Sequence, residues 1–259
     1  MRYRRVLLVA VVAICTFASI GVNAYAGGSH QTGNFTEAAQ ATARDASAVV
    51  ETPPQPTTDH NCGDTGEKQQ EVEENLDELG GYGPLFVDGE QSQEDCDAIT
   101  KFQKRMGIQP AEGYAGEVTH SVLTRLVASD LDDCKADEGR QVCIDMTHQT
   151  LWVVDDGEIV LGPTAVRTGM AGYQTQPGVH TIKNKSPKEW SKPYKVWLPQ
   201  WQRFYGGQGL HQTTTYLHNM GPGAGSHGCV NLLPNDAAKL YEMLDVGDTI
   251  HLFGQRPGT

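Results

Sequence analysis

Residues 62–130 contain segments in which apolar residues recur every three or four positions, which is the period of an amphipathic helix. In "SQEDCDAITKFQKRMG", residues 92–107, Ser92 is placed to cap the first turn and Gly107 to end the last. Two further helices are predicted in "EKQQEVEENLDEL" and "GEVTHSVLTRLVAS". We therefore expect a small three-helix bundle over residues 62–130. The apolar positions of its central helix are Cys96, Ile99, Phe102 and Met106.

The pattern changes near residue 141, where apolar residues begin to alternate with polar ones. "QVCIDMTHQTLWVVDDGEIVLGPTAV" is rich in Val and Ile, and its Asp156-Gly157 pair is typical of a hairpin turn. A helix capped by Asn235 and a last strand in "DTIHLF" are predicted further on. The fold class is thus multidomain, with a small three-helix N-terminal bundle followed by a mostly-β domain. The expected boundaries are 131–140 for a linker, 141–254 for the mostly-β domain and 255–259 for a tail.

The first residues have the layout of an export signal. Three arginines precede an apolar run over residues 6–20, and small residues follow at Ala24 and Ala26. This layout predicts a signal peptide over residues 1–26. The alternative is an uncleaved membrane anchor, because the run is only slightly shorter than the ~18 residues that span a bilayer. Residues 27–61 are rich in Gly, Ser, Thr and Pro and are expected to form a flexible spacer.

Cysteine parity then singles out one thiol. Disulfides persist outside the cytoplasm, and removal of the signal peptide leaves five cysteines. Cys134 and Cys143 are close in sequence, and Cys62 and Cys96 belong to one compositional block. Two bridges between these partners would leave Cys229 free, and an unpaired cysteine in an exported protein is a candidate reactive group.

The net charge of −12 excludes one class of partner. Residues 61–140 hold 19 acidic and 7 basic residues, a difference that accounts for the whole net charge. The rest of the chain is near neutral. A nucleic acid would require a basic face, so we expect no nucleic-acid partner.

Cys229 lies in the glycine-rich stretch "GSHGCVNL", residues 225–232. An unperturbed thiol has a pKa of ~8.5, so a nucleophilic cysteine requires a histidine to take its proton. His211, His218 and His227 are candidates, and the glycines allow backbone N–H groups to approach a carbonyl oxygen. Zinc also accepts these ligand types, but the spacing fits no zinc motif known to us. A purely buried cysteine is disfavoured because the stretch is too rich in glycine for a packed strand.

The stretch "HQTTTYLHNMGPGAGSHGCVN", residues 211–231, resembles the active-site signature of the L,D-transpeptidases of the bacterial cell wall. In that family a histidine is followed, after about fourteen to seventeen residues, by Ser/Thr-His-Gly-Cys, an apolar residue and Asn or Arg. Here fourteen residues separate His211 from Ser226. His218 is too close to the cysteine to be the first histidine and is expected at the surface or in a flap. The resemblance extends over about 141–253 and includes "YQTQPGVHTI" and "GGQGLH".

The resemblance implies a role for each residue of the signature. Cys229 would be the nucleophile and His211 its base, with His227 and Gly228 on the oxyanion side. Gln212 stands where the family usually has Gly or Ser, and its backbone carbonyl would orient His211. The resemblance implies no metal and no cofactor. The residues expected to contact substrate are Ser226, Asn231, Gln212, Trp197 and Tyr205.

The helical region carries a second resemblance. "VDGEQSQEDCDAITKFQKRMGIQPAEGYAGEVTHSVLTRL" is similar to small three-helix peptidoglycan-binding modules, whose pattern runs from Asp-Gly through Phe-Gln to Gly-x-x-Gly-x-x-Thr. A structural spacer is the alternative for this region. The matching residues are Asp88, Gly89, Phe102, Gln103, Gly113, Gly116, Thr119 and Leu123.

Together the resemblances imply an enzyme of the cell envelope that forms 3→3 cross-links through a cysteine thioester. Its partners would be a peptidoglycan tetrapeptide stem as donor and a diaminopimelate side-chain amine as acceptor, with carbapenem β-lactams as inhibitors. The N-terminal segment would contact the membrane only if it stayed uncleaved. Two alternatives remain open, an L,D-carboxypeptidase in which water attacks the same thioester and a wall-binding protein without activity.

Overall fold

The computed structural model describes residues 62–259 except 63, 135, 137 and 222. The predicted signal peptide and spacer therefore lie outside the described residues. Within the described part of the chain, no helix is both long and apolar enough to cross a membrane.

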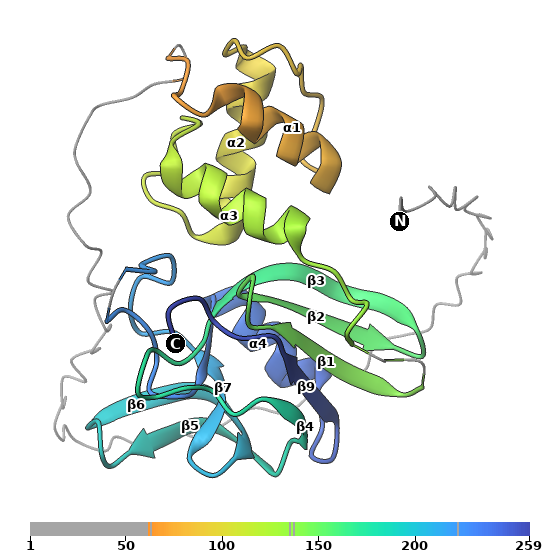
Figure 1. Cartoon of the computed structure of the whole chain (residues 1–259), viewed down its shortest axis with the longest axis vertical. Helices are drawn as coiled ribbons and strands as arrows, with labels where there is room; N and C mark the ends of the chain where they lie inside the picture. Colours follow the sequence, from red (N-terminus) through yellow and green to blue (C-terminus); the bar gives the residue numbers. More distant parts are fainter. Residues whose placement is uncertain (1–61, 63, 135, 137, 222) are drawn as a thin grey trace, which may run out of the picture. The chain divides into compact units, whose positions relative to one another are not determined.

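Three helices come first in the described chain (Figure 1). They are α1 (Gln69–Leu79), α2 (Gln93–Met106) and α3 (Glu117–Ala128). Ser92 caps α2, because its side chain accepts the backbone N–H of Asp95 while the Asp95 carboxylate accepts the N–H of Ser92. Gly107 ends the helix in the left-handed conformation that glycine adopts without strain. Both ends of α2 are those that the sequence predicts.

The apolar core of these helices continues into the rest of the chain. Ile99, Phe102 and Leu123 belong to one buried cluster that also contains Ala165, Leu217 and Leu233. The guanidinium of Arg105 on α2 lies 2.9 Å from the carboxylate of Asp236, which is itself buried. The helical region and the β region therefore pack against each other directly through this cluster.

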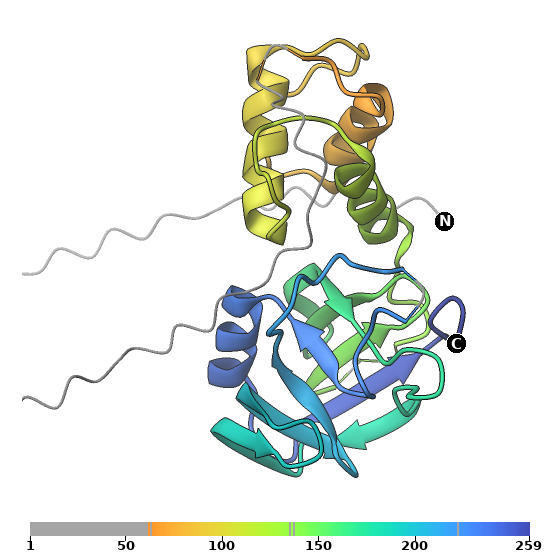
Figure 2. The same cartoon turned by 90° about the vertical axis from the view of Figure 1, so that its left-hand side faces the viewer.

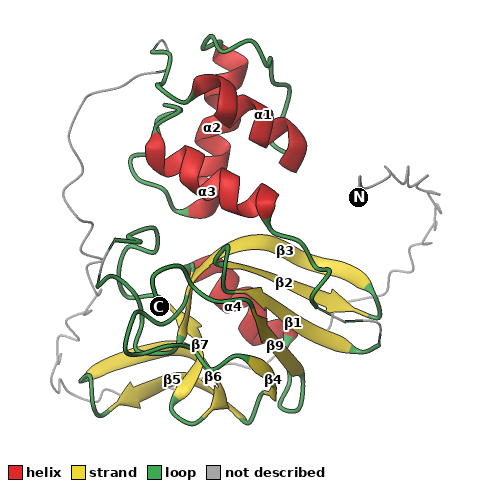
Figure 3. Cartoon of the chain, in the orientation of Figure 1, coloured by secondary structure: helices red, strands yellow, loops and turns green. Residues whose placement is uncertain are grey.

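The β region is one curled sheet of nine strands, shown in yellow in Figure 3 and from the side in Figure 2. Their order across the sheet is β4-β9-β1-β2-β3-β8-β7-β6-β5. Only β1 with β9 and β7 with β8 are parallel pairs; the other pairs in the described chain are antiparallel. The strands are β1 (Arg140–Asp145), β2 (Thr150–Asp155), β3 (Glu158–Arg167), β4 (Gly178–Thr181), β5 (Asn184–Ser191), β6 (Val196–Tyr205), β7 (Gln208–Gln212), β8 (Val230–Leu232) and β9 (Thr249–Phe253).

The helix α4 (Pro234–Met243) follows β8 and buries one face on the sheet. Its Ala237 and Leu240 share a core cluster with Phe204, Leu210 and other strand residues. The prediction that Asn235 caps this helix is wrong. The cap position is held by Leu233, without a side-chain hydrogen bond, and Pro234 occupies the first turn. Proline suits that position because its fixed φ matches the helix and its missing N–H would have no partner there.

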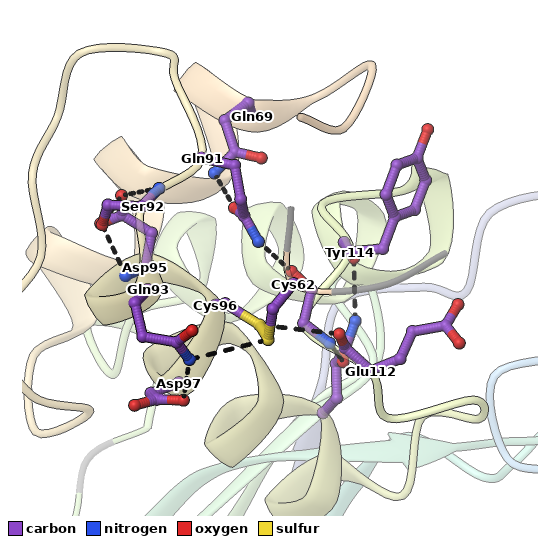
Figure 4. Close-up of a disulfide and its surroundings, with 12 residues drawn as sticks. Cys62, Gln69, Gln91, Ser92, Gln93, Asp95, Cys96, Asp97, Glu112 and Tyr114 are labelled. Carbon is purple, nitrogen blue, oxygen red and sulfur yellow. Dashed lines mark hydrogen bonds between the residues drawn. A yellow bond between two sulfur atoms is a disulfide. The ribbon is translucent and has the colours of Figure 1, made fainter. Parts of the chain in front are cut away.

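The mostly-β expectation for residues 141–254 is confirmed, and so are the two disulfides. Cys62 and Cys96 are bridged with their Cα atoms 5.4 Å apart, and Cys134 and Cys143 with theirs 5.8 Å apart. Figure 4 shows the first bridge, which ties the segment before α1 to α2. Among the described cysteines, Cys229 is the free one.

Candidate active site

The predicted base lies on β7, and the predicted nucleophile directly precedes the neighbouring parallel strand β8. On β7 and β8, His211 pairs with Asn231, and Leu210 pairs with Val230. Cys229 comes two residues before Asn231, and successive side chains of a strand alternate between its faces. The backbone register places Asn231 opposite His211, and the Cys229 thiol lies against the backbone of Gly207 and Gly209, just before His211. Both strands lie inside the sheet, between β3 and β6, so their backbones are held on both sides.

His211 is buried and both of its ring nitrogens have partners. Its Nδ1 lies 2.7 Å from the backbone oxygen of Gln212, and its Nε2 lies 3.1 Å from Nδ2 of Asn231. The Gln212 contact is the one that the sequence predicts. Burial lowers the pKa of His211 to about 4, a change that the nearby charge of Arg167 reinforces and the Gln212 hydrogen bond opposes. His211 is therefore neutral at physiological pH and can accept a proton.

Cys229 is half-buried, and its thiol donates a hydrogen bond to the backbone oxygen of Gly207 at 3.9 Å. Burial raises the pKa of the Cys229 thiol to about 11, although a backbone hydrogen bond at Gly209 lowers it in part. The resting pair is thus a neutral thiol and a neutral imidazole. A reaction at Cys229 then depends on transfer of its proton to a base, since the thiolate is scarce at neutral pH.

The turn before Cys229 is shaped by Ser226 and Gly228. The Ser226 hydroxyl accepts the N–H of Gly228 at 3.1 Å and donates to the backbone oxygen of Cys229. Gly228 has φ of 105°, and a Cβ at this position would lie 2.5 Å from the side-chain nitrogen of Gln208. Only glycine meets both demands without strain. In the resting structure the Gly228 N–H is bound within the turn, so a role as oxyanion donor requires that bond to open.

His227 is exposed and lies between two tyrosine rings. The centroid of its ring is 4.1 Å from that of Tyr194, which it stacks on, and 4.4 Å from that of Tyr173, which it meets edge-on. Tyr194 belongs to the turn that joins β5 and β6. The tip of this hairpin thus rests on the residue two positions before Cys229.

The predicted substrate residues of β6 lie further out. Trp197 is exposed, with its ring centroid 5.1 Å from that of Trp190 and 4.8 Å from the Lys188 ammonium. Tyr205 is exposed at the other end of the strand, 5.2 Å from the ring of His180. In the described chain their ring contacts are thus with these neighbours and not with Cys229 or His211.

The prediction that His218 lies at the surface or in a flap is wrong. His218 is buried, and its Nε2 lies 2.6 Å from the backbone oxygen of Met106 at the end of α2. Because a carbonyl only accepts, Nε2 carries the proton. Burial lowers the pKa of His218 to about 4. The loop between His211 and Cys229 packs under the helical region, which sequence spacing does not reveal.

Sequence reasoning missed Arg167, the last residue of β3. It is buried and pairs with Asn231 across β3 and β8. Its guanidinium donates to the oxygens of Tyr216, Thr215 and Asn231. An arginine that ends an otherwise apolar strand is the one signal in the sequence, and it does not point to the site by itself. Within the described residues, no group of three or more metal-ligating side chains is placed to hold an ion.

Comparisons with known proteins identify the class of protein that has this sheet and this cysteine–histidine site. Residues 139–252 match the model of the L,D-transpeptidase catalytic domain. The crystal structure of an L,D-transpeptidase from Stackebrandtia nassauensis is 61% identical, with a TM-score of 0.74, and the match covers 80% of this chain and 100% of that one. The chain therefore belongs to the L,D-transpeptidase family and is an enzyme that acts on peptidoglycan.

Other solved structures are more distant. An L,D-transpeptidase from Mycobacterium smegmatis is 26% identical with a TM-score of 0.37, and the match covers 44% of this chain and 58% of that one. One from Xylanimonas cellulosilytica is 24% identical with a TM-score of 0.42, and the match covers 78% of this chain and all of that one. No curated protein matches the chain.

Proposed function

We propose that this protein forms 3→3 peptidoglycan cross-links through a thioester on Cys229. The observation that carries the proposal is that the free thiol of Cys229 lies against the backbone of Gly207 and Gly209, just before His211 on the strand that pairs with β8. Membership of the L,D-transpeptidase family supports the substrate class. A thiol with a raised pKa beside a neutral histidine fits general-base activation.

In the first step the Asn231 N–H leaves Nε2 of His211, and the thiol proton of Cys229 passes to that nitrogen. The sulfur attacks the carbonyl carbon that joins diaminopimelate to the terminal D-Ala of a tetrapeptide stem. The C–N bond breaks, the leaving D-Ala amine takes the proton from His211, and a thioester remains. The oxyanion that forms in between is held by backbone N–H groups of the turn at Gly228 and Cys229. The Gly228 N–H joins them when it leaves the hydroxyl of Ser226.

In the second step the side-chain amine of a second stem attacks the thioester. The new amide bond forms as the C–S bond breaks, and His211 carries the amine proton back to the Cys229 sulfur. If water attacks in place of the amine, the product is a shortened stem, which is the carboxypeptidase alternative. A third possibility, a wall-binding protein without activity, is disfavoured because Cys229 is free and His211 is neutral.

The remaining signature residues are assigned to substrate contact and to the shape of the site. Gln212 orients His211 through its backbone oxygen, and Trp197 offers an exposed ring beside the ammonium of Lys188 for a stem that carries carboxylates. His227, held between two tyrosines, is assigned to the oxyanion side of the turn. No metal or cofactor enters the proposal. The other residues assigned to substrate contact are Ser226, Asn231 and Tyr205.

We also propose that the protein works outside the cytoplasm, at the cell wall, and that the helical region binds peptidoglycan. The substrate lies outside the cell, and the first 26 residues have an export layout. Carbapenems would acylate the same thiol, because their strained ring carries a carbonyl that the sulfur can attack. The spacer alternative for the helices stays open. The full chain with Cys229→Ala should co-sediment with purified sacculi. If the helices supply the binding, a variant that begins at residue 131 should stay in the supernatant.

The enzymatic proposal is tested with the products. Purified protein is incubated with disaccharide tetrapeptide, and the mixture is separated and analysed by mass spectrometry. A dimer that has lost one D-Ala and is linked between two diaminopimelate residues supports the transpeptidase. Tripeptide alone identifies the carboxypeptidase. If the Cys229→Ala protein yields the same products as the wild type, or the wild type yields none, the proposal is wrong.

A further inference from the structure

Arg167 connects the end of β3 to the residue that faces the candidate base. Its Nη1 donates to the backbone oxygen of Tyr216 at 2.7 Å. Its Nη2 donates to the Thr215 hydroxyl at 2.5 Å and to Oδ1 of Asn231 at 3.2 Å. Arg167 is 5% exposed, and all three acceptors are neutral. Burial of a cation among neutral acceptors costs desolvation free energy that no opposite charge offsets. The burial of Arg167 therefore calls for an explanation beyond packing.

The chemistry of the partners fixes the direction of each hydrogen bond. A guanidinium only donates, so the Asn231 atom that faces Arg167 is the amide oxygen. The other atom of that amide, Nδ2, then faces Nε2 of His211, and it too only donates. On the far side of the ring, the Gln212 carbonyl only accepts, so Nδ1 of His211 carries a proton. Nε2 is left as an acceptor, and the ring is neutral.

We propose that Arg167 is a positioning residue that acts through Asn231, and that it holds the resting His211 in the neutral tautomer that carries its proton on Nδ1. This inference rests on the proposed acyl transfer at Cys229. It assigns Asn231 a role in orienting the base, in addition to any contact with substrate. The proton that leaves the Cys229 sulfur can be received only at Nε2, because Nδ1 is already protonated and bound to Gln212, and Nε2 receives it when the Asn231 N–H leaves that nitrogen.

The same arrangement disfavours a charged His211. A proton on Nε2 would face the N–H of Asn231, and the amide cannot turn to offer its oxygen while Arg167 holds that oxygen. The positive charge of Arg167 acts in the same direction. The imidazolium formed when His211 receives the Cys229 proton is therefore destabilised. This favours transfer of the proton to the leaving amine. The resting site is kept from becoming a thiolate–imidazolium pair.

The groups around His211 come from four elements. From β3 comes Arg167, which is charged, and from β8 comes Asn231, which is neutral. From β7 itself comes the backbone oxygen of Gln212, and from β6 comes Trp201, whose ring centroid is 6.1 Å from that of His211. Arg167 is thus the charged group with a direct link to the ring, through a single amide.

The test follows the His211 ring by long-range proton–nitrogen NMR over pH 3.5–8 in the full-length protein. In the wild type, His211 should show the tautomer protonated at Nδ1 and should remain neutral down to the most acidic part of this range. Asn231→Asp replaces a donor by an acceptor, so Nε2 should become protonated and the midpoint of His211 should rise by at least about one pH unit. Arg167→Met releases the Asn231 oxygen and removes the charge, so it should raise the midpoint as well.

Asn235→Asp makes the same chemical change at an exposed position of α4 and should leave the midpoint unchanged. If Arg167→Met does not fold, the proposal is judged from the titration of Asn231→Asp and from the tautomer of wild-type His211. The proposal is overturned if wild-type His211 is protonated at Nε2, if folded Arg167→Met leaves the midpoint as in the wild type, or if Asn231→Asp leaves both tautomer and midpoint as in the wild type. These readouts need no substrate, so they hold or fail separately from the cross-linking activity.

Discussion

The imidazole of His211 and the amide of Asn231 face each other across β7 and β8, with Nε2 and Nδ2 3.1 Å apart. This contact, together with the Gln212 carbonyl on the other side of the ring, leaves His211 as a neutral base. The partner thiol of Cys229 is neutral too, because burial raises its pKa to about 11. In the proposed mechanism the nucleophile is therefore generated by proton transfer during the reaction.

The two buried histidines should respond differently to alanine. His211→Ala removes the base and should slow acylation of Cys229 by a carbapenem by a factor of ~10²–10⁴. His218→Ala removes the hydrogen bond to Met106 and should lower the free energy of unfolding. Because His218 takes no part in the proposed reaction, this variant should slow acylation of the folded protein by less than about tenfold. The mass of the intact protein over time gives the rate. Loss of acylation in His218→Ala alone would mean that the base has been misassigned.

Gly228→Ala should impair acylation through the shape of the turn. Alanine at φ of 105° is strained by about 1–3 kcal/mol, and its Cβ would lie 2.5 Å from the Gln208 side chain. Gly223→Ala is the matched control, because Gly223 also has a positive φ, of 76°, but a Cβ there meets nothing within 4 Å. Carbapenem acylation should fall in the Gly228 variant and stay near the wild-type rate in the control. Equal rates in the two variants would exclude a role for the close contact with Gln208.

Stability should fall in acid because of the buried histidines. His211 and His218 have pKa values of about 4 in the folded protein, below the ordinary value of 6.5. Between pH 6.5 and 4 the unfolded chain binds protons at both residues while the folded chain does not, so the free energy of unfolding decreases as the pH falls through this window. His218→Gln keeps a donor for Met106 and removes one such proton, so urea unfolding should show a shallower pH dependence. An unchanged slope would contradict the low pKa of His218.

The ion pair of Arg105 and Asp236 should stabilise the joint between α2 and α4. Asp236 is buried and also accepts a hydrogen bond from Thr164. Asp236→Ala leaves these donors without their acceptor and should lower the free energy of unfolding by about 1–3 kcal/mol in urea. Glu71→Gln breaks the exposed pair with Lys68 and serves as a control that should change stability by less than about 1 kcal/mol. Similar small effects in both would show that the joint does not depend on this pair.

Local rules of the chain predict much of this fold. The cap at Ser92, the end of α2 at Gly107 and the turn at Asp156-Gly157 each follow from the conformational preference of a few neighbouring residues. The pairing of the four bridged cysteines follows from their closeness in sequence and composition, and parity leaves Cys229 free. These features depend on residues close in sequence or on simple counting.

Other features depend on packing between distant segments, and the sequence pattern does not predict them. The burial of His218 requires α2 to lie over the loop that contains it. The cluster that joins the helices to Leu217 and Leu233 requires the same contact. Arg167 reaches the site only because β3 pairs with β8, which follow each other in the sheet but are far apart in the chain. The spacing between His211 and Cys229 indicated the pair, but not the residues that orient it.

The most direct measurement of the central claim is the mass of the acyl-enzyme. The protein is mixed with a tetrapeptide stem ending in D-Ala, quenched in acid within seconds, and analysed intact and after digestion. The account predicts an adduct on the peptide containing Cys229, equal in mass to the stem without its D-Ala, and none in Cys229→Ala. An adduct on another residue, or cross-linked product from Cys229→Ala, would contradict the account.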